Sequence, residues 1–243
     1  MRAALSTWFR VDTDKTLMKI ETPLDHARIW IKTLDIIREW GELDNILYVD
    51  FCNEWPLDVW APFFTQQYGS QGIVGKDSVP WMKAVLAEFK RHYPQIPATF
   101  SFCHSVQDTE DDVSFLDFIE QHIWMTTGSD FYERVGYDFA RFDDTGYTNM
   151  ALHGEELYRS AQEHYDRCLV EEIQRVAQWA KRWEKPLVHN SAAQAVLDIL
   201  KEYGFTRASL RGWSGTAAEN DRRLETEIKA LDEQYVLQTY GRN

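Results

Sequence analysis

The sequence lacks several features that define common protein classes. No strand-like run is followed by GxGxxG or GxxxxGK[ST], so the dinucleotide-binding and phosphate-binding fingerprints are absent. No apolar run approaches the ~20 residues needed to span a bilayer, and the N-terminus has no apolar signal region. We therefore expect a soluble protein, cytoplasmic as given, with secretion of a longer parent chain left open.

Cysteine and positive charge are also scarce. The three cysteines, Cys52, Cys103 and Cys168, show no CxxC spacing, which favours buried free thiols over a disulfide framework or a zinc ribbon. The formal net charge is −13, and such an acidic chain repels nucleic-acid phosphates and anionic lipids. We expect neither nucleic acid nor a membrane as a partner, and a neutral or cationic ligand fits better.

Aromatic residues, in contrast, are abundant. The chain has ten Trp, eleven Tyr and thirteen Phe among 243 residues. Aromatic rings fill cores, and they also form flat apolar platforms on which ligands stack.

Short apolar runs alternate with helical patterns along the chain. The predicted strands are 3–9, 46–52, 98–103, 119–126, a strand beginning at 186–188, 206–210 and, as a seventh at most, 235–240. The predicted helices are 23–40, 78–92, 155–183 (one helix or two), 192–203 and 217–234, with a helical turn at 114–119. Thr22, Pro23 and Gly41 supply start and stop signals for the first helix.

This alternation predicts an α/β fold with a parallel sheet. Loops after the predicted strands, at 55–77, 104–113 and 127–148, are long and rich in aromatic and acidic residues, whereas loops before strands are short. In a (β/α) TIM-type barrel the site lies at the C-terminal ends of the strands, which agrees with this asymmetry. A closed barrel needs eight strands, so six or seven predict an incomplete one.

The stretch ILYVDFCNEWPLDVW, residues 46–60, places a carboxylate at the end of a strand suited to the middle of a sheet. Asn53 is able to bond a substrate hydroxyl. Trp55 and Trp60 are able to exclude water and raise the pKa of Glu54, which a general acid working near neutral pH requires. We interpret Glu54 as a functional carboxylate.

Four segments in order resemble one known family. They are LSTWFR at 5–10, the NEWP stretch, DDVSFLDFIEQHIWM at 111–125 and YERVGYDFARFDD at 132–144. They resemble the cellulase-like, sugar-binding branch of the clan A glycoside hydrolases, over roughly residues 3–188. The resemblance implies a (β/α)8 barrel that acts on β-linked sugars with retention of anomeric configuration.

The resemblance also implies roles for individual residues. Glu54 matches the acid/base, and Asn53 matches the residue that contacts the sugar 2-hydroxyl. His122 and Trp124 would line the same cleft, and Trp8 would stack on sugar; core packing is the other reading of both tryptophans. The substrate-binding residues predicted for this site are Asn53, Trp8, Trp55, His104, His122 and Trp124.

The chain departs from the family pattern at the second carboxylate. Retaining hydrolysis needs two carboxyl groups about 5–5.5 Å apart. QWAKRWEKPLV at 178–188 matches the approach to the family's nucleophile, but HNSAAQAV follows and no Glu stands at 189–193. A relocated nucleophile, or an inverting route, would use a loop acid. The loop acids are Glu110, Asp111, Asp112, Asp138, Asp143 and Asp144.

The two ends of the chain also depart from the family pattern. The first strand resembles the family's third, so two βα units are missing, and residues 189–243 form a divergent tail. We therefore expect one truncated barrel-like domain over 1–243. Its open edges predict pairing with a second copy, a covering tail helix, or low stability.

Two other functions are weighed against hydrolysis. One is a sugar-binding protein that has lost its nucleophile. The other is a metal-dependent hydrolase in which His104, His122 and His189 hold zinc, although no HxH or HExxH spacing supports it. We expect no organic cofactor and no metal.

Overall fold

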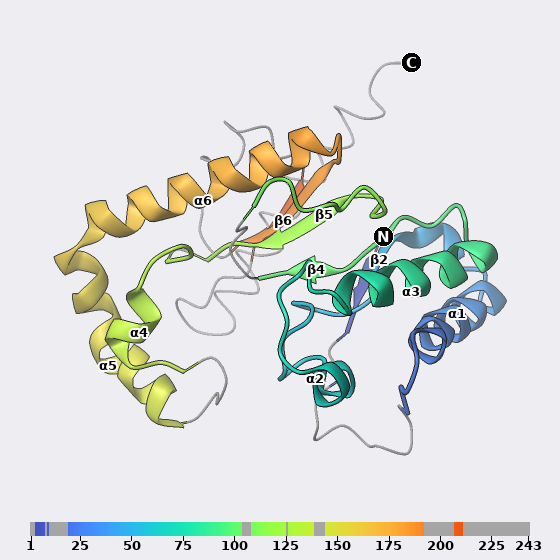
Figure 1. Ribbon diagram of the computed structural model, residues 1–243, viewed down its shortest axis with the longest axis horizontal. Coiled ribbons are helices and arrows are strands. Elements are labelled where there is room, and N and C mark those ends of the chain that lie inside the picture. The colour runs from blue at the N-terminus through green and yellow to red at the C-terminus, as the bar shows by residue number, and fades with distance from the viewer. Residues whose placement is uncertain are drawn as a thin grey trace.

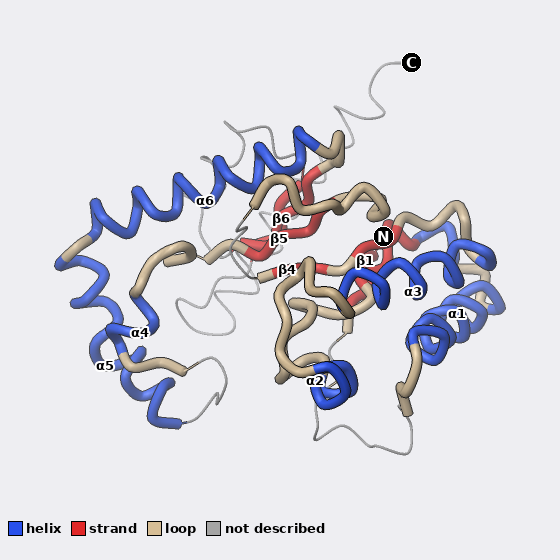
Figure 2. The backbone as a smooth tube through the Cα atoms, viewed as in Figure 1, coloured by secondary structure: helices blue, strands red, loops and turns tan. Residues whose placement is uncertain are grey.

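The computed structural model describes residues 3–7, 9, 19–103, 108–124, 126–138, 144–191 and 207–210, the last group and 189–191 by backbone alone. The chain has a mixed α/β fold with parallel sheets, and the strands lie side by side between two groups of helices (Figures 1 and 2). None of the described helices combines the length and apolar character needed to span a membrane.

The strands follow one another in chain order. One sheet has the order β1-β2-β3 and the other β4-β5-β6-β7, and every neighbouring pair is parallel. The bounds are β1 Ala3–Ser6, β2 Ile46–Asp50, β3 Ala98–Thr99, β4 Ser101–Phe102, β5 Ile119–His122, β6 Leu187–Ser191 and β7 Arg207–Leu210. Only the buried Phe100 separates β3 from β4, so one extended segment links the two sheets.

Seven helical segments lie among the described residues between these strands. They are α1 Pro23–Glu39, the 3-10 turn Leu43–Asn45, α2 Pro62–Tyr68, α3 Ser78–His92, α4 Phe131–Val135, α5 Asp144–Ser160 and α6 Gln162–Arg182. Parallel strands with helical connections, added in chain order, agree with part of a TIM-type glycoside hydrolase fold.

The start of α1 follows from its sequence. Thr22 and Asp25 form a capping box, in which the Asp25 N–H donates to Thr22 Oγ1 at 3.2 Å and the Thr22 N–H donates to Asp25 Oδ2 at 3.0 Å. Pro23 occupies the first turn, where no backbone donor is needed. The inner face of α1 carries Trp30 and Leu34, which belong to the main hydrophobic core.

The connection from β4 to β5 contains no helix among its described residues, 108–118. Side chains of this segment pack into the core instead, with Val113 and Leu116 at 0% and 1% exposed. The indole N–H of Trp179 on α6 donates to the Asp111 carbonyl at 2.8 Å. The helical turn predicted at 114–119 is found as a single hydrogen-bonded turn, in which the Leu116 N–H donates to the Val113 carbonyl at 3.0 Å, and it does not continue as a helix.

Most other predicted elements are confirmed within one to four residues. The helix at 78–92 has the predicted bounds, and the strand at 98–103 is divided at Phe100. The helical region predicted at 155–183 is two helices, but it begins earlier, at Asp144. Helices α2 and α4 were not predicted. The elements predicted at 192–203, 217–234 and 235–240 lie outside the described residues.

Candidate functional site

The site is built where β2 ends. The Asn53 N–H donates to the Thr7 carbonyl beyond β1, and the Trp55 N–H donates to the Ser101 carbonyl in β4, both at 2.8 Å. Glu54 lies between these two anchors with a positive φ of 54°, a left-handed conformation that a residue other than glycine rarely adopts. Bonds to both neighbouring strands therefore fix the direction in which Glu54 leaves the sheet.

Two nitrogen atoms hold the Glu54 carboxylate. Trp60 Nε1 donates to Oε2 at 2.8 Å, and His122 Nδ1 lies 3.0 Å from Oε1. The Glu54 side chain is 12% exposed and that of His122 is 4% exposed. The carboxylate is thus largely withdrawn from water but not sealed. Trp60 was expected to exclude water, and it also donates a hydrogen bond directly.

A buried carboxyl supports this arrangement from below. Asp50, 1% exposed, accepts from Ser6 Oγ at 2.5 Å and from Ser101 Oγ at 2.9 Å. Ser101 Oγ in turn accepts from the Glu54 N–H at 2.9 Å. Burial raises the pKa of Asp50, while the bonds from Ser6 and Ser101 and the nearby His122 oppose that rise. Asp50 therefore orients the hydroxyl that holds the Glu54 backbone.

Asn53 supplies a polar group next to the carboxylate. It is 7% exposed, and its side-chain amide forms no hydrogen bond with any described residue. A nearly buried amide without a protein partner is costly unless water or a ligand bonds it. The position of Asn53 therefore suits a ligand contact.

Two tyrosines that the sequence reasoning did not select also lie near Glu54. Burial raises the pKa of Tyr132, a hydrogen bond with Thr126 lowers it, and the negative charge of Glu54 raises it further. The pKa of Tyr137 is also raised, first by burial and then by Tyr147, with a smaller contribution from Glu54. Both lie within the segment 132–144 that resembles the family, and that was the available signal.

Trp55 does not reach the site. It is fully buried, its Nε1 donates to Ser78 Oγ at 2.8 Å, and its ring packs against Phe64 and Phe100 at centroid distances of 4.6 and 5.1 Å. The prediction that Trp55 contacts substrate is therefore corrected, because its ring has no exposed face for a sugar. The site includes Trp60 in its place.

The other predicted site residues are placed as follows. Trp124 is half-buried two residues beyond His122, and its backbone N–H donates to Thr127 Oγ1 at 2.7 Å. Trp8 and His104 lie outside the described residues, as does the side chain of His189. In the part of the chain that the structure describes, no three His, Cys, Asp or Glu residues are grouped as metal ligands.

The acidic residues at 110–112, which follow β4, were predicted at the C-terminal ends of the strands but lie elsewhere. Glu110 is paired with Arg182 at the end of α6, and Asp112 Oδ2 lies 3.4 Å from Lys83 Nζ on α3. Because α6 leads directly into the start of β6, Arg182 marks the end of the sheet where strands begin, opposite to His122. These acids therefore do not face Glu54. Of the later group, Asp138 and Asp144 are exposed and Asp143 is not described.

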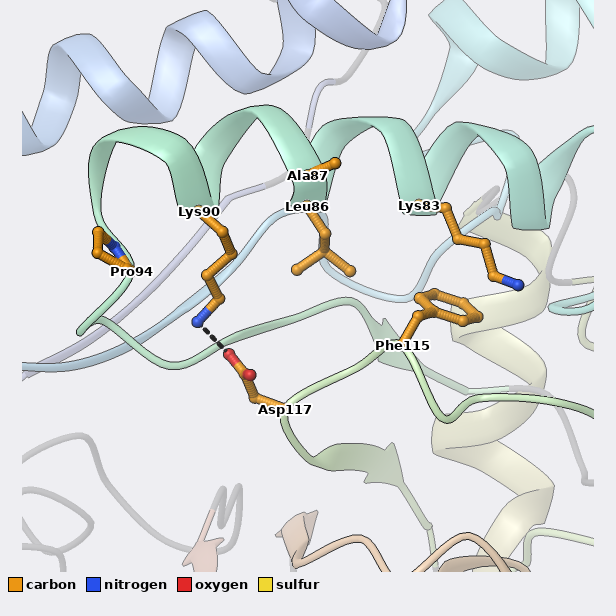
Figure 3. A pocket seen from close by; sticks show the side chains of 7 residues that line it. All are labelled: Lys83, Leu86, Ala87, Lys90, Pro94, Phe115 and Asp117. Atoms are coloured by element: carbon orange, nitrogen blue, oxygen red, sulfur yellow. Dashed lines mark ion pairs between the residues drawn. The ribbon is translucent and has the colours of Figure 1, made fainter.

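A pocket of about 390 Å³ lies on the outer surface beside α3 (Figure 3). Lys83 lies over the Phe115 ring, and Lys90 Nζ is paired with Asp117 Oδ2 at 2.5 Å. Asp117 also accepts from the N–H of Ala98, the first residue of β3, at 2.7 Å. The pocket is thus near the starting ends of the strands and is separate from the Glu54 site.

Comparison with known proteins agrees with this fold. Residues 1–219 match the family described as sugar-binding cellulase-like proteins, so the chain belongs to this family. The crystal structure of a protein from Parabacteroides distasonis ATCC 8503, proposed to be a glycoside hydrolase, is similar with a TM-score of 0.79 and 31% sequence identity. The match covers 96% of the present chain and 68% of that chain. No curated protein sequence matches.

Proposed function

We propose that the protein hydrolyses β-linked glucosides or β-glucans on an incomplete TIM-type barrel, with Glu54 as general acid/base. The observation that carries this proposal is the Glu54 carboxylate itself, bonded by Trp60 and His122 and only 12% exposed. The neighbouring Asn53 amide has no partner among the described residues and suits a sugar hydroxyl. Membership in a sugar-binding, cellulase-like family supports the ligand class.

The chemistry would proceed as follows. Protonated Glu54 gives its proton to the glycosidic oxygen as the bond between that oxygen and the anomeric carbon breaks. Water then supplies a hydroxyl to the anomeric carbon, and its proton returns to Glu54. The His122 and Trp60 nitrogens hold the carboxylate in place through both transfers, so that little reorganisation is needed.

The second carboxyl group of the reaction is unassigned. Asp50 is 1% exposed and is engaged with Ser6 and Ser101, and the acids at 110–112 lie toward the other end of the sheet. The chain at 189–193 also contains no Glu. This last observation favours a second candidate function, in which the protein binds saccharide without cleaving it.

Activity measurements on wild type and Glu54→Gln test the proposal. The substrates are a soluble β-glucan and two aryl β-glucosides with good and poor leaving groups. We expect kcat/KM to fall at least ~10²-fold in the variant with the poor leaving group. The loss should be smaller with the good leaving group, which departs without a proton. Glu42→Gln, at an exposed position, is the control.

Binding measurements decide between the two candidates. If both proteins are inert yet bind oligosaccharide, the sugar-binding function is supported and hydrolysis is excluded. If neither protein binds nor cleaves any saccharide, both candidates fail.

A further inference from the structure

Helix α4, helix α5 and the first turns of α6 form a helical arm that stands apart from α1, α2 and α3 (Figure 1). The arm follows β5 directly, and β5 ends at His122, which contacts Glu54. The chain therefore passes from the candidate acid/base site into the arm within about ten residues. Side chains at the start of the arm are therefore candidates for contact with any ligand longer than one sugar ring.

Three tyrosines of the arm form a continuous row. The Tyr132 and Tyr137 ring centroids lie 5.7 Å apart, and those of Tyr137 and Tyr147 lie 5.6 Å apart. The Tyr147 phenol also contributes to the raised pKa of Tyr137, which agrees with their close contact. The row therefore extends over a distance longer than a single ring.

The row has an inner and an outer end. Tyr132 and Tyr137 follow β5, whose last residue His122 contacts Glu54, and they form the inner end of the row. The negative charge of Glu54, which contributes to the raised pKa of both phenols, agrees with this placement. Tyr132 and Tyr137 are half-buried, whereas Tyr147 is 52% exposed. Exposure thus increases along the row from Tyr132 and Tyr137 to Tyr147.

The row rests on a small core of its own. Phe131, Val135 and Tyr165 are buried beneath it, and Tyr132 and Tyr137 pack against this cluster. The Phe131 and Tyr132 rings meet edge to face at 5.6 Å. Support of this kind fixes the ring orientations before a ligand arrives, which lowers the entropy cost of binding.

We propose that Tyr132, Tyr137 and Tyr147 form a wall that binds sugar units beyond the unit at Glu54, so the ligand is an oligosaccharide or polysaccharide. The inference rests on the proposed function at Glu54. Tyrosine faces pack against the C–H faces of sugars, and phenol hydroxyls bond sugar hydroxyls. A neutral ligand also suits a chain with a net charge of −13.

The test measures affinity for β-1,4-glucan oligosaccharides of two to six units, using Glu54→Gln protein so that no ligand is consumed. Adding Tyr147→Ala should weaken binding of the six-unit ligand about three- to tenfold, the range expected for loss of one aromatic contact. Binding of the two-unit ligand should be unchanged. Because Tyr147 is half exposed, the variant should fold.

Tyr68→Ala is the matched control, since Tyr68 is 41% exposed on α2 and is not part of the row. It should bind all ligands as the parent does. The proposed tyrosine wall would be contradicted if Tyr147→Ala left the affinity for the six-unit ligand unchanged, or weakened binding equally at every ligand length. Either result would leave the proposed site at Glu54 intact. Failure of every ligand to bind the parent would overturn the proposed function instead.

Discussion

The sheet with its helices and the helical arm contrast in how they are held together. The main core runs through β2, the β3–β4 segment, α1, α3 and α6 and contains many fully buried aromatic rings. The hydrophobic cluster of the arm consists of the buried Phe131, Val135 and Tyr165, with partly buried tyrosines around them. Glu54 is attached to the first region and the tyrosine row to the second. The acid is therefore rigidly fixed, whereas the wall stands on a weakly buried support.

Truncation of one large ring in each region tests this contrast and should give the largest effects. Trp55→Ala removes a fully buried ring bonded to Ser78 and should cost about 4 kcal/mol of unfolding free energy. Phe131→Ala should cost about 3 kcal/mol, the lower end of the range for such truncations, since the smaller arm cluster is able to collapse around the gap.

Urea unfolding measures both losses, and segment-resolved hydrogen exchange locates them. Phe131→Ala should speed exchange in residues 131–165 while 46–60 stay protected. Equal acceleration in both regions would show that the arm and the sheet unfold as one unit.

The pH dependence of stability should separate the two regions next. His26 is fully buried in the main core, where its Nδ1 accepts from Trp81 Nε1 at 3.2 Å and its Nε2 donates to the Phe51 carbonyl at 3.0 Å. Burial lowers the pKa of His26 to about 4. A protonated ring would turn a second N–H toward the Trp81 N–H, so the neutral form is required.

The direction of the effect follows from the two pKa values. Below pH 6.5 the unfolded chain binds a proton that the folded chain refuses, so stability is present above about 6.5 and is lost as the pH falls to 4. The loss is about 3 kcal/mol between pH 7 and pH 4. The stability difference between wild type and His26→Gln should shrink accordingly. A pH-independent stability difference between wild type and His26→Gln would contradict the assignment.

The same contrast explains what the sequence was able to predict. Helices α1 and α3 bury regular apolar faces, and α1 carries a capping box, so local signals and tertiary packing agree. Helix α5 was largely missed because it contains Gly146 and Gly154, which lower helix propensity. At Gly154 a Cβ would lie 3.7 Å from the Phe131 ring, an ordinary contact, so the packing of α5 on α4 holds the helix together despite its two glycines rather than requiring glycine at this position.

The site divides in a similar way. Glu54 was predictable because a carboxylate directly after a buried strand is visible in the sequence. The sequence did not show that His122 contacts Glu54. That contact, at 3.0 Å between residues 68 positions apart, depends on the parallel pairing of β4 with β5. Trp55 was misassigned because the sequence does not tell which of two nearby indoles, Trp55 or Trp60, points into the core.

The smallest change in stability, with a specific change in activity, is expected from a pair of buried serines. Ser101 Oγ accepts from the Glu54 N–H and donates to Asp50, and Ser78 Oγ accepts from Trp55 Nε1 and donates to the Ile73 carbonyl at 2.8 Å. Both are 0% exposed. Substitution by Ala removes two hydrogen bonds in each case, so the free energy of unfolding should fall by a similar amount, about 1–2 kcal/mol, in both variants.

Only Ser101→Ala releases the backbone of Glu54, and on the proposed function it should lower kcat about tenfold with little change in KM, because the carboxylate is displaced rather than removed. Ser78→Ala should keep wild-type kcat at the same loss of stability. Comparing these two variants thus distinguishes an effect on the position of the Glu54 carboxylate from an effect on fold stability. Equal kcat in the two variants would mean that the bonds from Ser101 stabilise the sheet end without directing Glu54.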